Sequence, residues 1–416
     1  MITTVRGVRD ILPAEMPGWR LLEQTARQIF SSYGYQELRT PIFEKTELFA
    51  RAVGATSDIV EKEMYTFADR GGDSLSLRPE GTASVVRAFI ENNLQRTLPW
   101  AIYYMGPMFR YERPQKGRFR QFHQMGCELF GAEGPLADAE MMAMVLRFLR
   151  RIGVESSLTL EINSLGCSQC REPYRGQLLA FLQTRFESLC EHCRQRLQRN
   201  PLRILDCKGE GCRAVARQAP FMKDHLCGAC GEHFQGLTAT LTDLQLPFAI
   251  NPLMVRGLDY YNRTAFEVTT TALGTQNAVA AGGRYDGLVA EMGGVQTPAI
   301  GFAMGMERLA LLLDAARVDA SLPLLYLVAV GAAAGQRGVL LAEQWRDGGL
   351  PVVLDPLGGS MKAQLKRADR AGARFVLILG ERELAEQAVL MKNMVDGVQQ
   401  VLGWDAVVAQ CSGLLT

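Results

Sequence analysis

The feature that most constrains this chain is a cluster of cysteines in its middle. Eight of the ten cysteines among 416 residues form four close pairs, at Cys167 and Cys170, Cys190 and Cys193, Cys207 and Cys212, and Cys227 and Cys230. Three pairs have the two-residue gap with which one short loop presents two thiolates to a single ion. We therefore expect structural zinc, in two four-cysteine sites or in one site with spare cysteines; buried free thiols are the alternative. The sequence leaves open which pairs share an ion, and a histidine could replace a cysteine at His192, His225 or His233.

The cysteines also mark a change of character along the chain. Between about Glu161 and Pro247 helical patterns, charges and cysteines dominate, and strand-like, Gly-rich sequence resumes at Asn251. A chain of 416 residues exceeds one ordinary domain. We expect one domain built from residues 1–160 and 248–320, an insertion at 161–247, and a further domain at 324–416. A small insertion buries little apolar surface, so a metal ion would add to its folding energy.

The first segment combines helices with strands. Apolar residues at helical spacing predict helices over Glu15–Phe30 and Asp138–Arg151, and Gln36–Thr40 is extended. Aromatic and β-forming residues predict two strands over Ala101–Arg110 and Arg118–Phe130, joined by a polar, basic loop.

The last segment alternates between strand and helix patterns. Strands are expected at Leu325–Val330, Pro351–Leu354 and Phe375–Leu379, with helices between them at Gln336–Trp345 and Ser360–Ala371. Such alternation is typical of a small α/β domain with a largely parallel sheet.

Charge and hydropathy exclude some classes of protein. The net charge of +1 argues against a chain coated in basic residues, although local clusters occur at Arg110–Arg120 and Lys362–Arg374. Each cluster is either a solvated face or a nucleic-acid contact. No apolar run reaches the roughly 20 residues of a membrane span. The first residues do not resemble a signal peptide, so we expect a cytoplasmic protein.

The residues that carry chemistry begin in the predicted hairpin. A Phe-Arg-x-Glu unit at Phe109–Glu112, the basic loop and the returning strand resemble motif 2 of class II aminoacyl-tRNA synthetases. In that family the arginine, here Arg110, holds the α-phosphate of ATP. A planar guanidinium makes paired hydrogen bonds to phosphate oxygens and stabilises charge that develops there. On four residues alone, an exposed hairpin with scattered charge would be the better interpretation.

A second stretch is similar to motif 3 of the same class. Gly-x-Glu-Arg at Gly305–Arg308 follows Gly301, which we place one helical turn earlier, although many family members have a further glycine where Ala303 stands. Small residues let the backbone approach adenine, and Arg308 would lie near the γ-phosphate. Motif 1 is expected near Thr40–Pro41, where a proline ends an extended segment.

Longer stretches are similar to signatures of one branch of this class, the histidyl-tRNA synthetases. They are residues 253–267 and 281–288, supported by 5–13, 77–82 and 121–128. With the C-terminal segment, the resemblance covers nearly the whole chain. It implies an α+β fold: a class II catalytic domain on an antiparallel sheet, a helical cysteine-rich insertion, and a small C-terminal α/β anticodon-binding domain. Members of the family are homodimers, and motif 1 usually builds the interface.

The resemblance also implies roles for single residues. The α-ammonium group of histidine would be held by Glu80, Thr82 and Gln124, and its imidazole by Glu128, Tyr261 and Tyr285. Arg256 would bridge the histidine carboxylate and the α-phosphate. ATP, with Mg²⁺, would be bound by Arg110, Glu112 and Arg308. Both imidazole nitrogens need partners when buried, so a pocket that supplies them rejects apolar side chains.

The activity that the resemblance implies is ligation of histidine to the 3′ end of tRNA(His) through a histidyl-adenylate. No protein nucleophile is needed, because positioning and positive charge supply most of the catalysis. One alternative is the non-catalytic regulatory subunit of an ATP phosphoribosyltransferase, which shares the fold but usually lacks the C-terminal domain. Another is a plain metal-binding or nucleic-acid-binding protein. The retained Arg110, Arg256 and Arg308 favour the enzyme.

Overall fold

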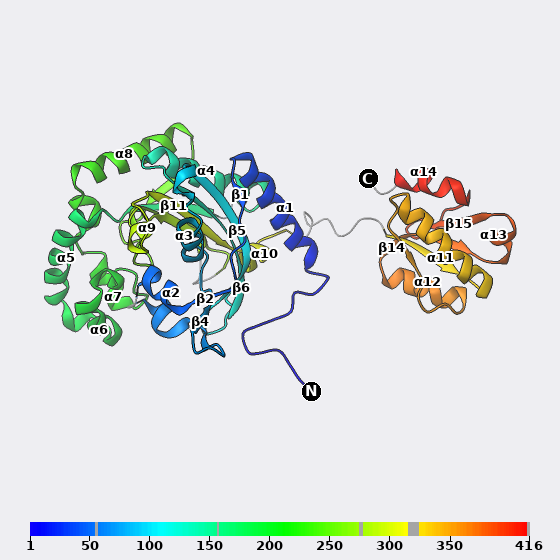
Figure 1. Cartoon of the computed structure of the whole chain (residues 1–416), viewed down its shortest axis with the longest axis horizontal. Helices are drawn as coiled ribbons and strands as arrows, with labels where there is room; N and C mark the ends of the chain where they lie inside the picture. Colours follow the sequence, from blue (N-terminus) through cyan, green and yellow to red (C-terminus); the bar gives the residue numbers. More distant parts are fainter. Residues whose placement is uncertain (55–56, 156–157, 274–277, 315–323, 414–416) are drawn as a thin grey trace. The chain divides into compact units, whose positions relative to one another are not determined.

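The structure, a computed structural model, describes residues 1–54, 57–155, 158–273, 278–314 and 324–413. The chain divides into two compact units, Met1–Val318 and Asp319–Thr416 (Figure 1). The predicted boundaries at residue 320 and at Thr416 lie outside the described residues. Within the described ranges, no helix has both the length and the apolar character needed to cross a membrane.

The first unit is built on an eight-stranded sheet. In spatial order its strands are β1 (Gln36–Glu37), β5 (Trp100–Phe109), β6 (Gln121–Phe130), β11 (Ala299–Gly305), β10 (Ala278–Arg284), β9 (Asn262–Thr270), β7 (Leu158–Ser164) and β8 (Phe248–Ile250). The six inner strands are antiparallel, and only the short outer strands pair in parallel. The expected antiparallel sheet is therefore confirmed.

The two faces of this sheet carry separate apolar cores. Along β5, Tyr103 belongs to one core, whereas its neighbours Ile102 and Tyr104 belong to the other, because successive side chains of a strand point to opposite faces. The first core is covered by α1 (Met16–Ser32) and α4 (Pro135–Arg151). These helices correspond to the ones predicted over Glu15–Phe30 and Asp138–Arg151. The second is covered by α2 (Thr46–Val53), α3 (Thr82–Glu91) and α9 (Leu288–Glu291). A small sheet of β2 (Phe43–Lys45), β4 (Ser74–Leu77) and β3 (Thr66–Ala68) lies in the same unit.

Pairing of β6 with β11 brings two distant parts of the sequence together. Gly301 lies opposite Glu128, and Gly305 opposite Gln124. Our interpretation of Gly301 as lying one helical turn before Gly305 was wrong. Both glycines lie in strand β11, and helix α10 (Met306–Ala310) begins only afterwards. A side chain at position 301 would overlap the Glu128 carboxylate, so the glycine there makes room for that group.

The cysteine-rich segment between β7 and β8 is helical. It contains α5 (Ser168–Gln183), α6 (Glu191–Arg199), α7 (Glu210–Ala216) and α8 (Gly228–Asp243), which Figure 1 shows in green. Its own small core includes four buried cysteines, Cys170, Cys193, Cys212 and Cys230. Helix α8 also packs against the first core of the sheet, where its Leu237 and Leu241 are fully buried.

The second unit has one five-stranded sheet, ordered β13 (Val352–Leu354), β12 (Leu324–Ala329), β14 (Ala373–Leu379), β15 (Ala388–Asn393) and β16 (Gln399–Gly403). Its helices are α11 (Ala332–Asp347), α12 (Met361–Arg370), α13 (Glu381–Ala385) and α14 (Val407–Ser412). The predicted α/β architecture is confirmed, but the sheet is not largely parallel. Strands β15 and β16 form an antiparallel hairpin on β14, because the short α13 leaves no crossover that could carry the chain back.

Candidate active site

A cavity of about 320 Å³ opens on the sheet of the first unit. Eight of the ten predicted active-site residues line it: Glu80, Thr82, Arg110, Glu112, Gln124, Arg256, Tyr261 and Arg308. They come from the start of α3, from the hairpin of β5 and β6, from the segment before β9 and from α10. Segments that are far apart in sequence thus meet at one small-molecule-sized pocket.

Glu80 is fixed at the start of helix α3. Its carboxylate accepts hydrogen bonds from the backbone N–H groups of Thr82 (2.7 Å) and Ala83 (2.8 Å), which the first turn of a helix leaves free. Burial raises the pKa of the Glu80 carboxyl, and these two hydrogen bonds oppose the rise. A carboxylate so held can accept a further hydrogen bond from a cationic ligand.

Glu128 and Tyr285 lie together behind the cavity wall. The Glu128 carboxylate accepts hydrogen bonds from Thr82 Oγ1 at 2.7 Å and from Tyr285 Oη at 2.6 Å. Burial raises the pKa of Glu128 to about 8, and the two hydrogen bonds limit that rise. The structure therefore joins the predicted histidine-binding residues Thr82, Glu128 and Tyr285 into one hydrogen-bonded chain.

Two tyrosines of the wall were missed. Tyr104 and Tyr260 both line the cavity, and the ring of Tyr260 lies 4.6 Å from that of Tyr261 and 5.6 Å from that of Tyr285. The signal for Tyr260 was its position beside Tyr261 in the signature. The signal for Tyr104 was that alternate side chains of β5 point to the same face of the sheet.

Four arginines, Arg110, Arg118, Arg256 and Arg308, are among the lining residues. Burial lowers the pKa of Arg308, and the positive charges of Arg118 and Arg110 lower it further. Burial also lowers the pKa of Arg110, whose Nε donates to the carbonyl oxygen of Pro79 at 2.8 Å. Cations that destabilise one another in this way are suited to a ligand with several negative charges.

Arg256 is positioned by an acidic partner. It pairs with Glu267, which raises the pKa of the guanidinium although burial alone would lower it. Its Nε and the Oε1 of Gln124 are buried and have no hydrogen-bond partner among the described residues. Because buried polar atoms are seldom left unpaired, both atoms indicate a polar ligand in the cavity.

Glu112 lies at the base of the loop between β5 and β6, where it pairs with Arg118. The Arg120 guanidinium stacks on the ring of Tyr111 at 3.8 Å. Part of the basic cluster at Arg110–Arg120 therefore makes contacts within the loop itself.

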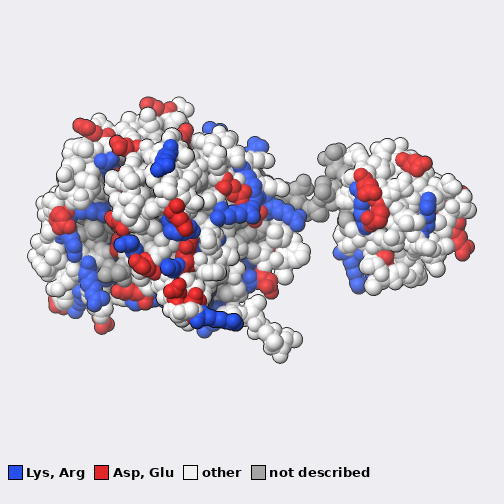
Figure 2. Space-filling model, viewed as in Figure 1, with Lys and Arg blue, Asp and Glu red and all other residues white. Residues whose placement is uncertain are grey.

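Basic and acidic side chains are interspersed over the visible face of the first unit (Figure 2), in agreement with a net charge of +1.

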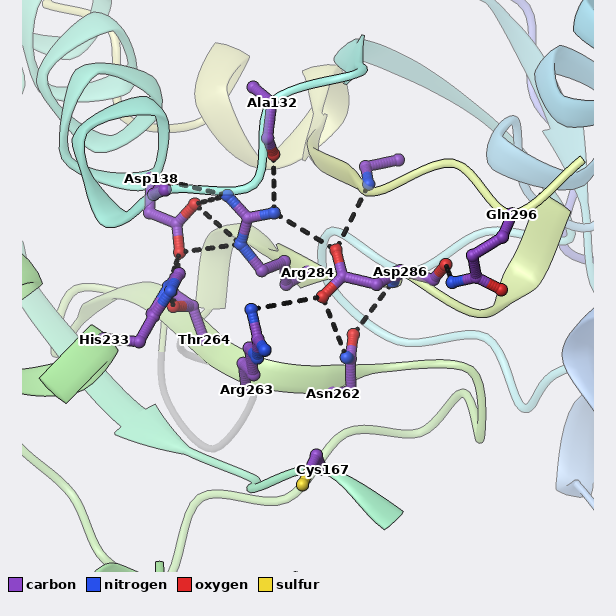
Figure 3. Close-up of polar contacts among 12 residues, drawn as sticks. Ala132, Asp138, Cys167, His233, Asn262, Arg263, Thr264, Arg284, Asp286 and Gln296 are labelled. Atoms are coloured by element: carbon purple, nitrogen blue, oxygen red, sulfur yellow. Dashed lines mark hydrogen bonds and ion pairs between the residues drawn. The ribbon is translucent and has the colours of Figure 1, made fainter. Parts of the chain in front are cut away.

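A buried polar network (Figure 3) supports the end of strand β10 at Arg284. Asp138 of α4 accepts hydrogen bonds from Arg284 at 2.5 Å and from Thr264 at 2.5 Å. Arg284, which is fully buried, also pairs with Asp286 at 3.1 Å. Arg284 and Asp286 flank Tyr285, so the network fixes the backbone that presents the tyrosine. Asp138 carried no signal in the sequence, since it lies in an ordinary helical pattern.

His233 belongs to the same network. Its Nε2 lies 2.8 Å from Asp138 Oδ2, and His233 is in neither cysteine group, so it does not take the place of a cysteine there. The ring of His225 lies beside that of Tyr174, with 5.6 Å between ring centres and an angle of 39° between the ring planes. The cysteines themselves gather in two groups of four, described below.

In the second unit, helix α12 presents a basic ridge. Lys362, Lys366 and Arg370 are exposed and four residues apart, so they share one face. Arg367 is different, because it pairs with Asp355 at 2.7 Å and lowers the pKa of that carboxyl to about 2.

Comparisons with known proteins agree over both units. The family model described as histidyl-tRNA synthetase matches residues 7–309, and the one described as anticodon binding domain matches residues 325–414. The histidine–tRNA ligase of Trichlorobacter lovleyi is 52% identical over 406 residues, 97% of this chain and 96% of the relative. That of Syntrophotalea carbinolica is 48% identical over 407 residues, 98% of this chain and 97% of the relative. The crystal structure of apo S. aureus histidyl-tRNA synthetase superposes with a TM-score of 0.82 at 36% identity, covering 99% of each chain. The chain thus has the class II synthetase fold and belongs to the histidyl-tRNA synthetase family.

Proposed function

We propose that the chain converts ATP, L-histidine and tRNA(His) into AMP, diphosphate and L-histidyl-tRNA(His). The observation that carries this proposal is the convergence of buried carboxylates, tyrosines and arginines on one cavity. The carboxylate-lined part suits an amino acid with a cationic α-ammonium group, and the arginines suit a polyphosphate.

Histidine would be held between Glu80, Gln124 and the tyrosines. The Glu80 carboxylate and the Oε1 of Gln124, which has no partner in the described part of the chain, would accept hydrogen bonds from the α-ammonium group. Tyr261 lines the cavity and would contact the imidazole directly, whereas Glu128 and Tyr285 lie behind the wall and would have to become accessible to partner the imidazole nitrogens. Thr82 acts on this pocket through Glu128, to which it donates. An amino acid without a polar ring would leave these groups unpaired, which disfavours its binding strongly.

ATP would lie against the arginines. Arg110, Arg256 and Arg308 would contact phosphate oxygens, with Arg256 also contacting the histidine carboxylate. Glu112 and Glu267 line the same cavity and offer oxygen ligands of the kind that Mg²⁺ prefers. Bound there, Mg²⁺ would offset the negative charge of the phosphates. Both carboxylates are paired with arginines, and those pairs would rearrange when Mg²⁺ binds.

The reaction then has two steps. A carboxylate oxygen of histidine attacks the α-phosphorus, the bond to the β-phosphate oxygen breaks, and diphosphate leaves with that electron pair. The 3′ hydroxyl of the terminal adenosine next attacks the activated carbonyl carbon, and AMP leaves. Arg110 and Arg256 stabilise the charge on the phosphorus oxygens, and the aligned reactants supply most of the remaining rate.

The tRNA would contact both units. The loop Glu112–Gly117 would approach its acceptor end, and the basic ridge of α12 would contact the phosphate backbone near the anticodon.

We also propose a cytoplasmic homodimer whose interface includes the motif 1 region near Thr40–Pro41. Exposed apolar side chains at Ile42, Phe43 and Phe67 support this assignment. The cysteines lie outside the cavity lining, so an ion there would take no part in the chemistry.

The decisive experiment is ATP–diphosphate exchange with each amino acid in turn. We expect exchange with histidine and none with glutamine, asparagine or tyrosine. Equal exchange with another amino acid would contradict the assigned substrate. Absence of exchange with all amino acids would favour the regulatory-subunit alternative. The match of residues 325–414 to an anticodon-binding domain argues against that alternative.

A further inference from the structure

The eight cysteines of the helical insertion fall into two separate groups. The outer group, named for its place in the sequence, consists of Cys167, Cys170, Cys227 and Cys230. The inner group lies between these pairs in the sequence and consists of Cys190, Cys193, Cys207 and Cys212. Within each group all four sulfur atoms lie within 4.8 Å of one another. The pairing that the sequence left open is therefore nested: the first and last pairs share one site, and the two middle pairs share the other.

The sulfur separations fit coordination of a single ion. Cys167 Sγ lies 3.7 Å from Cys170 Sγ and 3.8 Å from Cys227 Sγ, and Cys190 Sγ lies 3.9 Å from Cys207 Sγ. Four thiolates at the usual zinc–sulfur distance of about 2.3 Å define a tetrahedron with an edge of about 3.8 Å. A disulfide would need about 2.05 Å. Both groups thus have the spacing of a tetrahedral four-sulfur site and not that of disulfides.

Backbone donors point at the same sulfur atoms. The N–H of Cys227 donates to Cys170 Sγ at 3.1 Å, that of Cys190 to Cys212 Sγ at 3.2 Å, and that of Gly209 to Cys207 Sγ at 3.4 Å. In addition, Cys167, Cys190 and Cys227 are the N-cap residues of α5, α6 and α8. Hydrogen bonds to sulfur and the positive end of a helix both favour thiolates over thiols.

The backbone of the outer group is shaped for this geometry. Gly166 has φ of +62°, and a Cβ atom there would lie 2.6 Å from Cys170 Cβ. The turn before α5 therefore needs glycine to bring Cys167 and Cys170 to one point. Cys170 and Cys230 are 3% and 1% exposed, so an ion held by them would lie at the edge of the insertion's small core.

We propose that the insertion binds two structural Zn²⁺ ions, one in the outer and one in the inner group. Four protein sulfurs complete the coordination of each ion and leave no open position for substrate, as in structural zinc sites. Tetrahedral four-sulfur geometry suits zinc or iron, and the four sulfurs in each group are close enough to surround only one ion.

Metal analysis of the full-length chain, purified without chelator, tests this assignment. We expect two equivalents of zinc per chain, one after Cys227→Ser and one after Cys190→Ser. Cys411→Ala, which removes a buried cysteine of the second unit, is the matched control and should retain two equivalents. Less than half an equivalent in the unaltered chain, iron in place of zinc, or two equivalents in both serine variants would overturn the proposal.

A second measurement decides the matter if a serine variant does not fold. Metal-free full-length chain is titrated with Co²⁺, which absorbs visible light strongly when four thiolates surround it tetrahedrally. The absorbance should rise to an end point at two equivalents and be abolished by stoichiometric Zn²⁺. An end point at one equivalent or none would contradict the two sites, and neither readout depends on enzymatic activity.

Discussion

Arg256 illustrates at the scale of one residue how the cavity is prepared for charge. The side chain is held by Glu267, yet its Nε remains without a partner among the described residues. Preorganised donors of this kind stabilise a transition state without having to move during the reaction. The signature in the sequence identified Arg256, because the arginine stands within a long and specific stretch. Its acidic partner was not assigned a role there, since the partnership depends on how the segment before β9 folds back on that strand.

Replacing Arg256 with alanine should lower histidine-dependent exchange by about a hundredfold to a thousandfold. The fold should persist, because the Glu267 side chain is 26% exposed and can remain hydrated. Arg256→Lys should also be poor, since lysine lacks the planar two-pronged contact. Exchange rates and thermal unfolding check both variants, and Arg382→Ala on the exposed α13 is the control. Activity within a few-fold of the unaltered chain would refute the role.

Glu128 should make the free energy of unfolding depend on pH. Its folded pKa of about 8 lies above the unfolded value of 4.5, so between these values the folded chain binds one more proton than the unfolded chain. The stability that Glu128 contributes should be greatest below the unfolded pKa and fall by up to about 1.4 kcal/mol per pH unit until the folded pKa is passed. Denaturant titrations from pH 4.5 to 9 measure this slope. Glu128→Gln cannot ionise and should flatten the slope, whereas equal slopes would show that Glu128 is ionised throughout.

The residues that only support the site were the ones that the sequence did not reveal, although Thr264 and Arg284 lie inside the two histidine signatures. Asp138, Arg284 and Thr264 form a buried network behind Tyr285, but an aspartate in a helix usually faces solvent. Only the packing of α4 against β9 and β10 shows that its carboxylate is buried and paired. The roles of individual site residues came from signatures, whereas these supporting contacts depend on the three-dimensional arrangement.

At the scale of elements, the pairing of β6 with β11 determines the shape of the histidine pocket. Glu128 needs the space that Gly301 leaves on the neighbouring strand. The sequence predicted β6 because its aromatic and β-forming residues are strong signals. It did not predict β11, since its small residues resemble the start of a helix. The hairpin of β15 and β16 was missed as well, because no helix lies between these two strands and the alternation of strand and helix ends at β15.

Gly301→Ala should disturb this pocket selectively. The added methyl group would overlap the Glu128 carboxylate, which is tied to Thr82 and Tyr285 and cannot withdraw freely. We expect the KM for histidine to rise at least about tenfold and the midpoint of thermal unfolding to fall, since overpacking usually costs 1–3 kcal/mol. Gly305→Ala in the same strand, where the nearest side-chain atom would be 3.8 Å away, should unfold at an unchanged temperature. Equal behaviour of the two variants would contradict the contact.

At the scale of the whole molecule, the predicted active-site residues all lie in the first unit. The second unit has two apolar clusters of its own, one on each face of its sheet. Composition and the change of pattern near residue 324 were enough to anticipate a separate α/β segment. Nothing in a single sequence specifies which side chains of that segment face a partner.

Deleting residues 324–416 should therefore impair tRNA charging far more than adenylate formation. Charging is measured with labelled histidine and tRNA(His), and adenylate formation by diphosphate exchange. A triple replacement of Lys362, Lys366 and Arg370 by glutamate keeps the chain complete and should weaken charging in a salt-dependent manner. If both steps fell equally after the deletion, the second unit would stabilise the enzyme and not bind tRNA.

The nested cysteine pairs have a consequence for the order in which the insertion matures. The inner group joins residues 17 positions apart, whereas the outer group joins residues 60 positions apart. Closing the longer loop costs about 1 kcal/mol more chain entropy, and it requires that everything between has already been synthesised. The proposed inner site can therefore form early and locally, and the proposed outer site would close last, between the end of β7 and the start of α8. The outer site would then close the loop that contains α5, α6 and α7. This loop contacts the catalytic part of the unit directly, because the Arg203 guanidinium donates a hydrogen bond to the backbone carbonyl oxygen of Arg256 at 3.1 Å.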